Sequence, residues 1–172
     1  MNLRKIRYIG PIDNPSINGL ILELQKAVQD KVSEVYIEMS SEGGEFKPAF
    51  KAYDFLLHYE LPVTICNVGA VSSAAIVPFM AVPKRSCLVG GKFFIHPPAW
   101  NFVGDSVETI DSLQSKVREL MCHKERYAEI LDRLTSEING HKLSEYLSSE
   151  SVYLSGPLAL QVGLCNCDVD IP

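Results

Sequence analysis

Two spacings of apolar residues alternate along the chain. Short segments that are apolar throughout, or at every second position, predict strands at 6–9, 35–39, 63–68, 86–89 and 93–96. Between the first four of these, apolar residues recur every three or four positions and predict helices at 14–28, 46–57 and 72–80. This alternation favours a mostly parallel sheet whose strands are joined by right-handed crossovers.

Four residues are expected to mark the ends of these elements. Asn14 has the pattern of a helix cap, and the proline after it is expected to be the first helical residue. Gly69 is expected to break the third strand. Ser155 is expected to cap a short last helix, which Gly163 closes.

The longest helical pattern runs from 107 to 134. At about 1.5 Å per residue such a helix would extend roughly 40 Å, which is more than a compact domain of this size can cover. We therefore expect this helix to project from the body of the protein. Its apolar face would then be buried against another copy of the chain.

Composition narrows the class of protein. The 172 residues are 47% hydrophobic and 22% charged, which fits one globular domain. The net charge of -5 argues against a nucleic-acid surface. No apolar run approaches the ~20 residues of a membrane-spanning helix, and the basic start at 1–7 has no apolar stretch behind it. We expect a cytoplasmic protein that binds neither membranes nor nucleic acids.

The five cysteines support the same compartment. Their number is odd, and Cys165 and Cys167 have no second His/Cys pair at the spacing of a zinc site. Reduced thiols and no bound metal are therefore expected.

Three short segments could carry chemistry, and each also has a structural interpretation. Gly43 and Gly44 lie between a strand and a helix, where they either make a tight turn or direct backbone N–H groups into a cleft. Ser72 and Ser73 lie at the next strand-to-helix turn, as a helix cap or as a nucleophile. His96 ends an apolar strand before two prolines, in a structural role or as a general base.

Taken in order, these segments resemble the proteolytic subunit of the Clp protease family (ClpP). The resemblance extends over about 6–168 and is carried by Ser-Glu-Gly-Gly at 41–44, by the segment 64–72, by the segment 84–98 with its Phe-Ile-His-Pro-Pro, and by the segment 153–164. It implies an α/β fold of the ClpP/crotonase type, with repeated strand-strand-helix units and a long projecting handle helix. The single domain would have a head at about 1–100 and 151–172 and a handle at about 101–150.

The resemblance also implies a serine peptidase that needs no cofactor. It places the nucleophile at Ser72, the general base at His96, and the oxyanion-hole donors on the backbone N–H groups of Gly44 and Ser73. Ser73 is the rival nucleophile if the alignment is shifted by one residue. Ser72 is preferred because counting from 64–66 needs no gap.

The chain departs from the family pattern at several positions. The acidic third member of the family's triad corresponds to Ser151, and the adjacent Glu150 could accept the imidazole N–H after a small backbone shift, so both are candidates. Glu42 and Glu45 bring carboxylates near a site that must stabilise negative charge. Because the chain starts almost at its first strand, we do not expect an ATP-dependent unfoldase as a partner.

Three functions remain open from the sequence. The first is a serine peptidase that cleaves short or unfolded peptides and forms homo-oligomeric rings through its handle. The second is a catalytically impaired scaffold or regulatory subunit, which the missing acid favours. The third is an acyl-CoA enzyme of the crotonase fold, for which Glu42 or Glu45 could supply the carboxylate.

Overall fold

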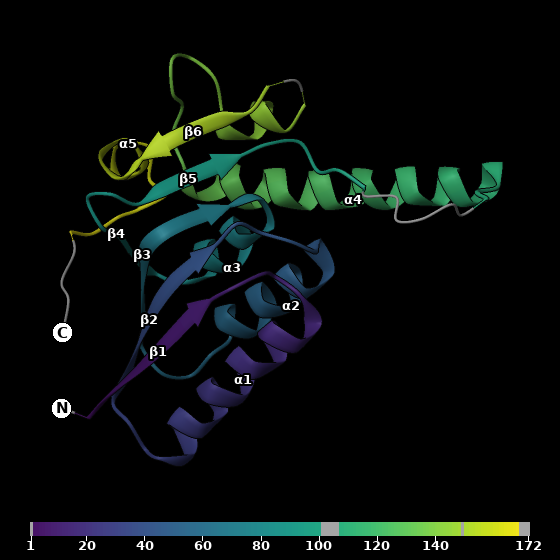
Figure 1. The fold of residues 1–172 in the computed structure, drawn as a ribbon. Coiled ribbons are helices and arrows are strands. Elements are labelled where there is room, and N and C mark those ends of the chain that lie inside the picture. Colours follow the sequence, from purple (N-terminus) through teal and green to yellow (C-terminus); the bar gives the residue numbers. More distant parts are fainter. Residues whose placement is uncertain (1, 101–106, 149, 169–172) are drawn as a thin grey trace.

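The computed structural model describes residues 2–100, 107–148 and 150–168. In these ranges a single six-stranded sheet forms the centre of the protein (Figure 1). Its strands are β1 (Leu3–Ile9), β2 (Glu34–Ser41), β3 (Val63–Ser72), β4 (Lys84–Cys87), β5 (Lys92–Ile95) and β6 (Val152–Ser155). The helices are α1 (Asn14–Gln29), α2 (Phe46–Leu57), α3 (Ile76–Ala81), α4 (Ile110–Leu134) and α5 (Gly156–Gln161), with 3₁₀ turns η1 (Ser73–Ala75) and η2 (Leu143–Leu147).

Most of the sheet is parallel, as the alternation of strands and helices predicts. The strand order is β1-β2-β3-β5-β6, and the pairs from β1 to β5 are parallel. The first half of β3 pairs with β4 and its last three residues pair with β5. The end strand β6 is antiparallel to β5. β3 is therefore central, and its last residues lie between β2 and β5.

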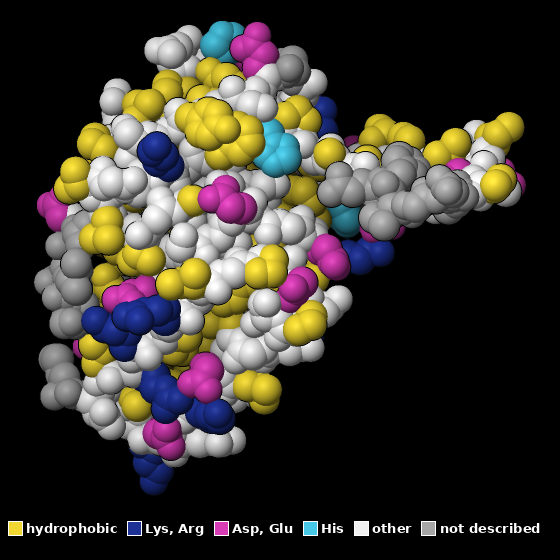
Figure 2. Space-filling model, viewed as in Figure 1, with side chains coloured by type: hydrophobic (Ala, Val, Ile, Leu, Met, Phe, Trp, Pro, Cys, Tyr) yellow, Lys and Arg dark blue, Asp and Glu magenta, His cyan; other side chains and the backbone are white. Residues whose placement is uncertain are grey.

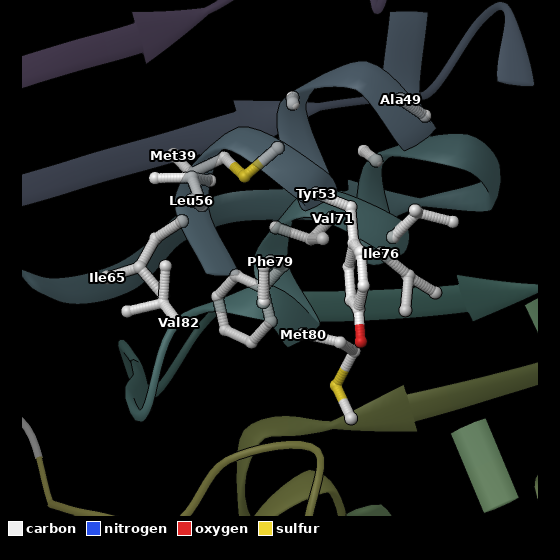
Figure 3. Packing of buried hydrophobic residues seen from close by; sticks show 14 of the residues in the cluster. Met39, Ala49, Tyr53, Leu56, Ile65, Val71, Ile76, Phe79, Met80 and Val82 are labelled. Carbon is white, nitrogen blue, oxygen red and sulfur yellow. The ribbon is translucent and has the colours of Figure 1, made fainter. Parts of the chain in front are cut away.

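The hydrophobic core lies between one face of this sheet and helices α1, α2 and α3 (Figure 1). Inward-facing strand residues such as Met39, Ile65 and Val71 meet Leu56 of α2 and Phe79 of α3 (Figure 3). All five are almost completely buried. Burying a side chain of this size stabilises the folded state by roughly 1.5–3 kcal/mol. This packing fixes the positions of the ends of β2 and β3.

Helix α4 projects from the body, as the length of its pattern predicts (Figure 1). Tyr127, Ile130 and Leu131 are its buried residues, and they lie in its second half. The first half exposes an apolar stripe, part of which can be seen along the projecting arm in Figure 2. The stripe consists of Ile110, Leu113, Val117 and Met121.

Several expected boundaries were wrong. The helix expected at 72–80 is α3 at Ile76–Ala81, because Ser72 still belongs to β3 and η1 follows it, and the strand expected at 86–89 is β4 at Lys84–Cys87. Three other differences have a local cause. The cap of α1 is Asp13, whose side chain accepts a hydrogen bond from the backbone N–H of Ser16, so Asn14 is the first helical residue. α4 begins at Ile110, not at 107, because Thr109 caps it. Gly69 does not end β3, which continues to Ser72.

Side chains explain why β3 continues past Gly69. The pairing advances two residues in β2, from Met39 to Ser41, but four residues in β3, from Asn67 to Val71. This bulge is supported by Asn67, whose side chain accepts from the N–H of Gly69 and donates to the carbonyl of Lys92 in β5. These bonds replace the missing ladder bonds, so the strand bends without stopping.

Arg85 anchors the last segment of the chain to the body. Its guanidinium is buried, and it donates to the carbonyls of Val82 (2.8 Å), Gly163 (3.1 Å) and Leu164 (2.9 Å). No carboxylate in the described ranges pairs with it. Desolvation lowers the pKa of Arg85 from its ordinary value. In the described residues the charge is thus stabilised by the dipoles of three backbone carbonyls.

Candidate active site

The two neighbouring serines lie where β3 turns into η1. Ser72, the last strand residue, has an extended backbone with φ of -124° and ψ of 148°. Ser73 has a φ of +53°, which is uncommon and strained for a residue other than glycine. Both are nearly buried, with 4% and 8% of their surface exposed. A strained residue at a strand-to-helix turn is the geometry of a nucleophile elbow.

The glycine turn between β2 and α2 is held by the loop before α1. The N–H of Ile12 donates to the carbonyl of Gly43, and the N–H of Glu45 donates to the carbonyl of Ile12, each at 2.8 Å. A Cβ on Gly44 would lie 2.3 Å from the carbonyl oxygen of Ile12, so no side chain fits there. The N–H of Gly44 donates to no group in the described part of the chain. It is therefore available to a bound molecule.

The glycine turn and the serine turn are in direct contact. A Cβ on Gly43 would lie 2.8 Å from the carbonyl oxygen of Ser72, 2.8 Å from Cβ of Ser73 and 3.3 Å from the backbone nitrogen of Ala74. Only glycine permits this approach. Because the carbonyl oxygen and the following N–H of a trans peptide point in opposite directions, the N–H of Ser73 is directed away from the Ser72 carbonyl that faces Gly43.

A carboxylate also reaches the serine turn. Oγ of Ser72 donates to Oε2 of Glu42 at 3.2 Å. Glu45 immediately precedes α2 and its side chain makes no capping hydrogen bond. The expectation that Glu42 brings negative charge close to the serines is confirmed.

His96 follows directly after β5, on the side of the sheet where β3 ends. Because Ser72 pairs with Phe94, His96 lies two residues further along, roughly 7 Å. Its ring stacks on Phe94 with the ring centroids 5.1 Å apart. Within the described ranges His96 makes no hydrogen bond to Ser72 or Ser73.

The partner of the His96 ring is a backbone carbonyl. Nδ1 lies 2.8 Å from the carbonyl oxygen of Pro97. A carbonyl can only accept, so this contact requires Nδ1–H and leaves Nε2 as the basic nitrogen of the neutral ring. The tautomer is the one that a general base facing a serine needs.

The two candidates for a third triad member lie differently. Ile95 and Val152 form the last pair of the β5–β6 ladder, so the next residues along the two strands are His96 and Ser151. The charge of Glu150 instead acts on His141, whose pKa is raised mainly by its hydrogen bond to Glu145 and to a smaller extent by Glu150. Neither candidate makes a hydrogen bond to His96 in the described part of the chain.

A pocket of about 510 Å³ adjoins the glycine turn. Its walls come from three parts of the chain: the glycine turn and the start of α2, the segment after His96, and α4. Its lining includes Gly44, Phe46, Trp100, Glu119 and His123. Burial is the main cause that lowers the pKa of His123.

The family of the chain can now be stated from sequence comparison. A family model described as Clp protease matches residues 1–167. The chain belongs to the Clp protease family. The family resemblance and the α/β fold expected from the sequence are confirmed.

Individual relatives in the Clp family are distant. The chain is 23% identical over 167 residues to ATP-dependent Clp protease proteolytic subunit 3 of Rhizobium etli, covering 95% of this chain and 82% of the relative. It is 24% identical over 172 residues to proteolytic subunit 2 of Treponema pallidum, with 96% and 82% covered. The structure of a ClpP1 mutant from Listeria monocytogenes superposes with a TM-score of 0.80 at 19% identity, covering 98% of this chain and 92% of that one.

Sequence reasoning missed three groups of this site. They are the N–H of Ala74, the carbonyl of Pro97 and the side chain of Tyr127, whose hydroxyl donates to the carbonyl of Ser73 at 3.3 Å. The first two are backbone groups and leave no trace in a residue pattern. Tyr127 lies three positions before Ile130 on the apolar face of α4, so its spacing could have indicated burial but not its partner.

Proposed function

We propose that this Clp-family protein is a serine-type peptidase that hydrolyses peptides or unfolded protein segments without a cofactor. The observation that carries the proposal is the contact between the glycine turn and the strained serine turn. A serine hydroxyl attacks the peptide carbonyl while His96 removes its proton and later protonates the departing amine. Backbone N–H groups at the two turns stabilise the tetrahedral oxyanion, and one such donor is worth about 3–4 kcal/mol.

The nucleophile is one of the two adjacent serines. Counting from 64–66 favours Ser72, with Gly44 and Ser73 as the N–H donors. The bulge adds residues to β3 between 66 and 72. Counting residues from 64–66 along the sequence therefore does not decide which of the two serines occupies the position of the nucleophile. The positive φ favours Ser73, for which the donors would be Gly44 and Ala74.

His96 would act with a neutral orienting group. The carbonyl of Pro97 can hold the imidazole in the required tautomer, but it stabilises the imidazolium less than a carboxylate does. We therefore propose a slow peptidase, with Ser151 and Glu150 as the residues whose replacement tests what completes the triad.

Substrate and assembly follow from the surfaces around the site. The pocket beside Gly44 is large enough to hold a substrate side chain, and 97–100 would border an extended peptide that binds as an added strand. The exposed apolar stripe of α4 would be covered by a second copy in a homo-oligomeric ring. A cytoplasmic location stays a prediction.

A catalytically impaired scaffold or regulatory subunit is the second candidate. It is favoured by the serine at position 151 and by the lack of a hydrogen bond between His96 and either serine in the described residues. Such a protein would keep the architecture and the assembly surface but hydrolyse no peptide.

A fluorophosphonate probe distinguishes these possibilities. We expect the wild type to be labelled, and exactly one of the variants Ser72→Ala and Ser73→Ala to lose the label. The unaffected serine variant then serves as the matched control. A wild type that is neither labelled nor active on fluorogenic peptides in any assembled form would support the scaffold.

A further inference from the structure

We propose that Tyr127 of α4 is a positioning residue of this site, which holds the glycine turn and the serine turn in their relative places. Its hydroxyl bonds to the carbonyl of Ser73, and its ring packs against Phe46 at the start of α2. The inference rests on the proposed peptidase function, because it concerns the donors that would stabilise the oxyanion.

Burial, a hydrogen bond and a ring contact restrict the side chain of Tyr127 to one position. The side chain is completely buried, and in the described residues its hydroxyl has one partner, the carbonyl oxygen of Ser73 at 3.3 Å. The Phe46 ring centroid lies 5.6 Å from that of Tyr127. A buried hydroxyl without a partner is unfavourable, so the hydroxyl and the carbonyl hold each other in place.

Phe46 links this tyrosine to the glycine turn. It comes two residues after Gly44 and is the first residue of α2. One side chain of α4 therefore contacts the serine turn and the first residue of the helix that follows the glycine turn, although the two turns follow different strands. A shift of Tyr127 would move one turn relative to the other.

The bond also sets the direction of an amide. The carbonyl of Ser73 and the N–H of Ala74 belong to one planar trans peptide and point in opposite directions. With the carbonyl held by Tyr127, the N–H of Ala74 is directed away from α4, and its nitrogen lies 3.3 Å from the Cβ position of Gly43. Donors that are already oriented lower a barrier more than donors that must reorient during the reaction.

The strain at Ser73 gives this bond further importance. A positive φ in serine persists only where the surroundings enforce it. The carbonyl of Ser73 accepts a second hydrogen bond from the N–H of Ile76, within the helix that follows. That bond is local to the turn, whereas the bond from Tyr127 ties the turn to a different helix.

The test is the variant Tyr127→Phe, which keeps the ring and removes only the hydroxyl. We expect kcat for a fluorogenic peptide to fall roughly tenfold while KM stays within twofold of the wild type, which corresponds to about 1.4 kcal/mol of transition-state stabilisation. The rate of fluorophosphonate labelling should fall by a similar factor. Measurements are made well below the melting temperatures of all variants.

Tyr59→Phe is the matched control. The hydroxyl of Tyr59 also donates to a backbone carbonyl, that of Leu24 in α1 at 2.6 Å, and Tyr59 lines no part of the site. We expect this variant to lose stability but to keep the kcat of the wild type. An effect on thermal stability alone would thus be shared by both variants, whereas the loss of kcat would be specific to Tyr127.

Two results would overturn the inference. If Tyr127→Phe retains the kcat and the labelling rate of the wild type, or changes only KM, Tyr127 does not position the site, although the peptidase itself stands. If the wild type shows no labelling and no hydrolysis, the proposed function fails and the positioning role fails with it. Wild-type activity therefore separates the two failures.

Discussion

The serine turn is buried and lies in contact with the buried Gly43 of the glycine turn, whereas the histidine that would serve them is half-buried at the end of a short strand. The first region is held from three sides, by the loop before α1, by the core under β3, and by Tyr127. The second is held by one carbonyl and by stacking on Phe94, which itself stacks on the exposed Tyr153. The part of the site proposed to stabilise negative charge is thus built by packing, and the part proposed to move the proton is not.

The largest expected effect comes from removing His96, the proposed base. We expect His96→Ala to lower kcat about 10³-fold, because general acid–base catalysis contributes a factor of this order. Peptide hydrolysis as a function of pH checks it. The control is Phe94→Leu, which removes the stacking partner but keeps the imidazole and should lose much less. Equal rates for His96→Ala and the wild type would contradict His96 as the base.

A break in the firmly held region should show in stability. Gly44→Ala would place a Cβ against the carbonyl of Ile12 in a backbone conformation with φ of +148°. We expect the free energy of unfolding to fall by about 2–4 kcal/mol, measured by urea denaturation.

Gly19 supplies the matched control for that substitution. It lies in α1 with open space around its Cβ position. Gly19→Ala should raise the stability by roughly 0.5–1 kcal/mol, because alanine favours the helix. A loss in this control, or no loss in Gly44→Ala, would be inconsistent with the described packing of the turn.

A carboxylate opposite His96 would hold its imidazole more firmly. Ser151 is the next residue opposite His96 across the β5–β6 ladder. A carboxylate there would orient the imidazole and stabilise its charged form, so we expect Ser151→Asp to raise kcat roughly tenfold. Glu150→Gln should leave kcat unchanged, since His96 makes no hydrogen bond to Glu150 in the described residues. A gain or loss from Glu150→Gln instead would identify that residue as the third member.

The smallest expected effect is a dependence of stability on pH through His123. Its ring stacks on Phe46 and makes a tilted contact with Phe50, and burial lowers its pKa against the weaker raising effect of Glu119. The pKa of His123 is thus lower in the folded state than in the unfolded state, where it is about 6.5. The free energy of unfolding is therefore highest above that pH and decreases as the pH falls below it, because the unfolded state then binds more protons.

Urea denaturation at pH 7.5 and pH 5.5 measures this effect. The wild type should lose more stability on acidification than His123→Phe. His141, whose pKa is raised, acts in the opposite direction but equally in both proteins. Identical losses in the two proteins would rule out the contribution of His123.

The fold could be predicted from the sequence wherever local pattern decides it. The helix at 46–57 was predicted at its observed bounds. The projecting helix was predicted to begin at 107, three residues before its observed start, and to end where it does. The end of β3 could not be predicted, because the bonds that carry the strand past Gly69 come from the side chain of Asn67 and from β5. β6 was not predicted either, because it has only four residues and depends on its pairing with β5.

The candidate site was predictable in its segments and not in its details. The family resemblance implies that Gly43 and Gly44 belong near the two serines, and Gly43 does contact both of them. Which serine is strained depends on the bulge, and what holds the strained turn depends on Tyr127, 54 residues away in the chain. Such relations arise only when distant segments pack together.

The buried Arg85 determines when this protein can complete its interior during synthesis. A guanidinium does not give up its proton, and two of its carbonyl partners belong to residues 163 and 164. Until that stretch has emerged from the ribosome, the nascent chain would have to keep a bare cation hydrated at the edge of β4. The last step of folding therefore waits for residues 163 and 164, and a chain that terminates before 163 would leave Arg85 without two of its carbonyl partners.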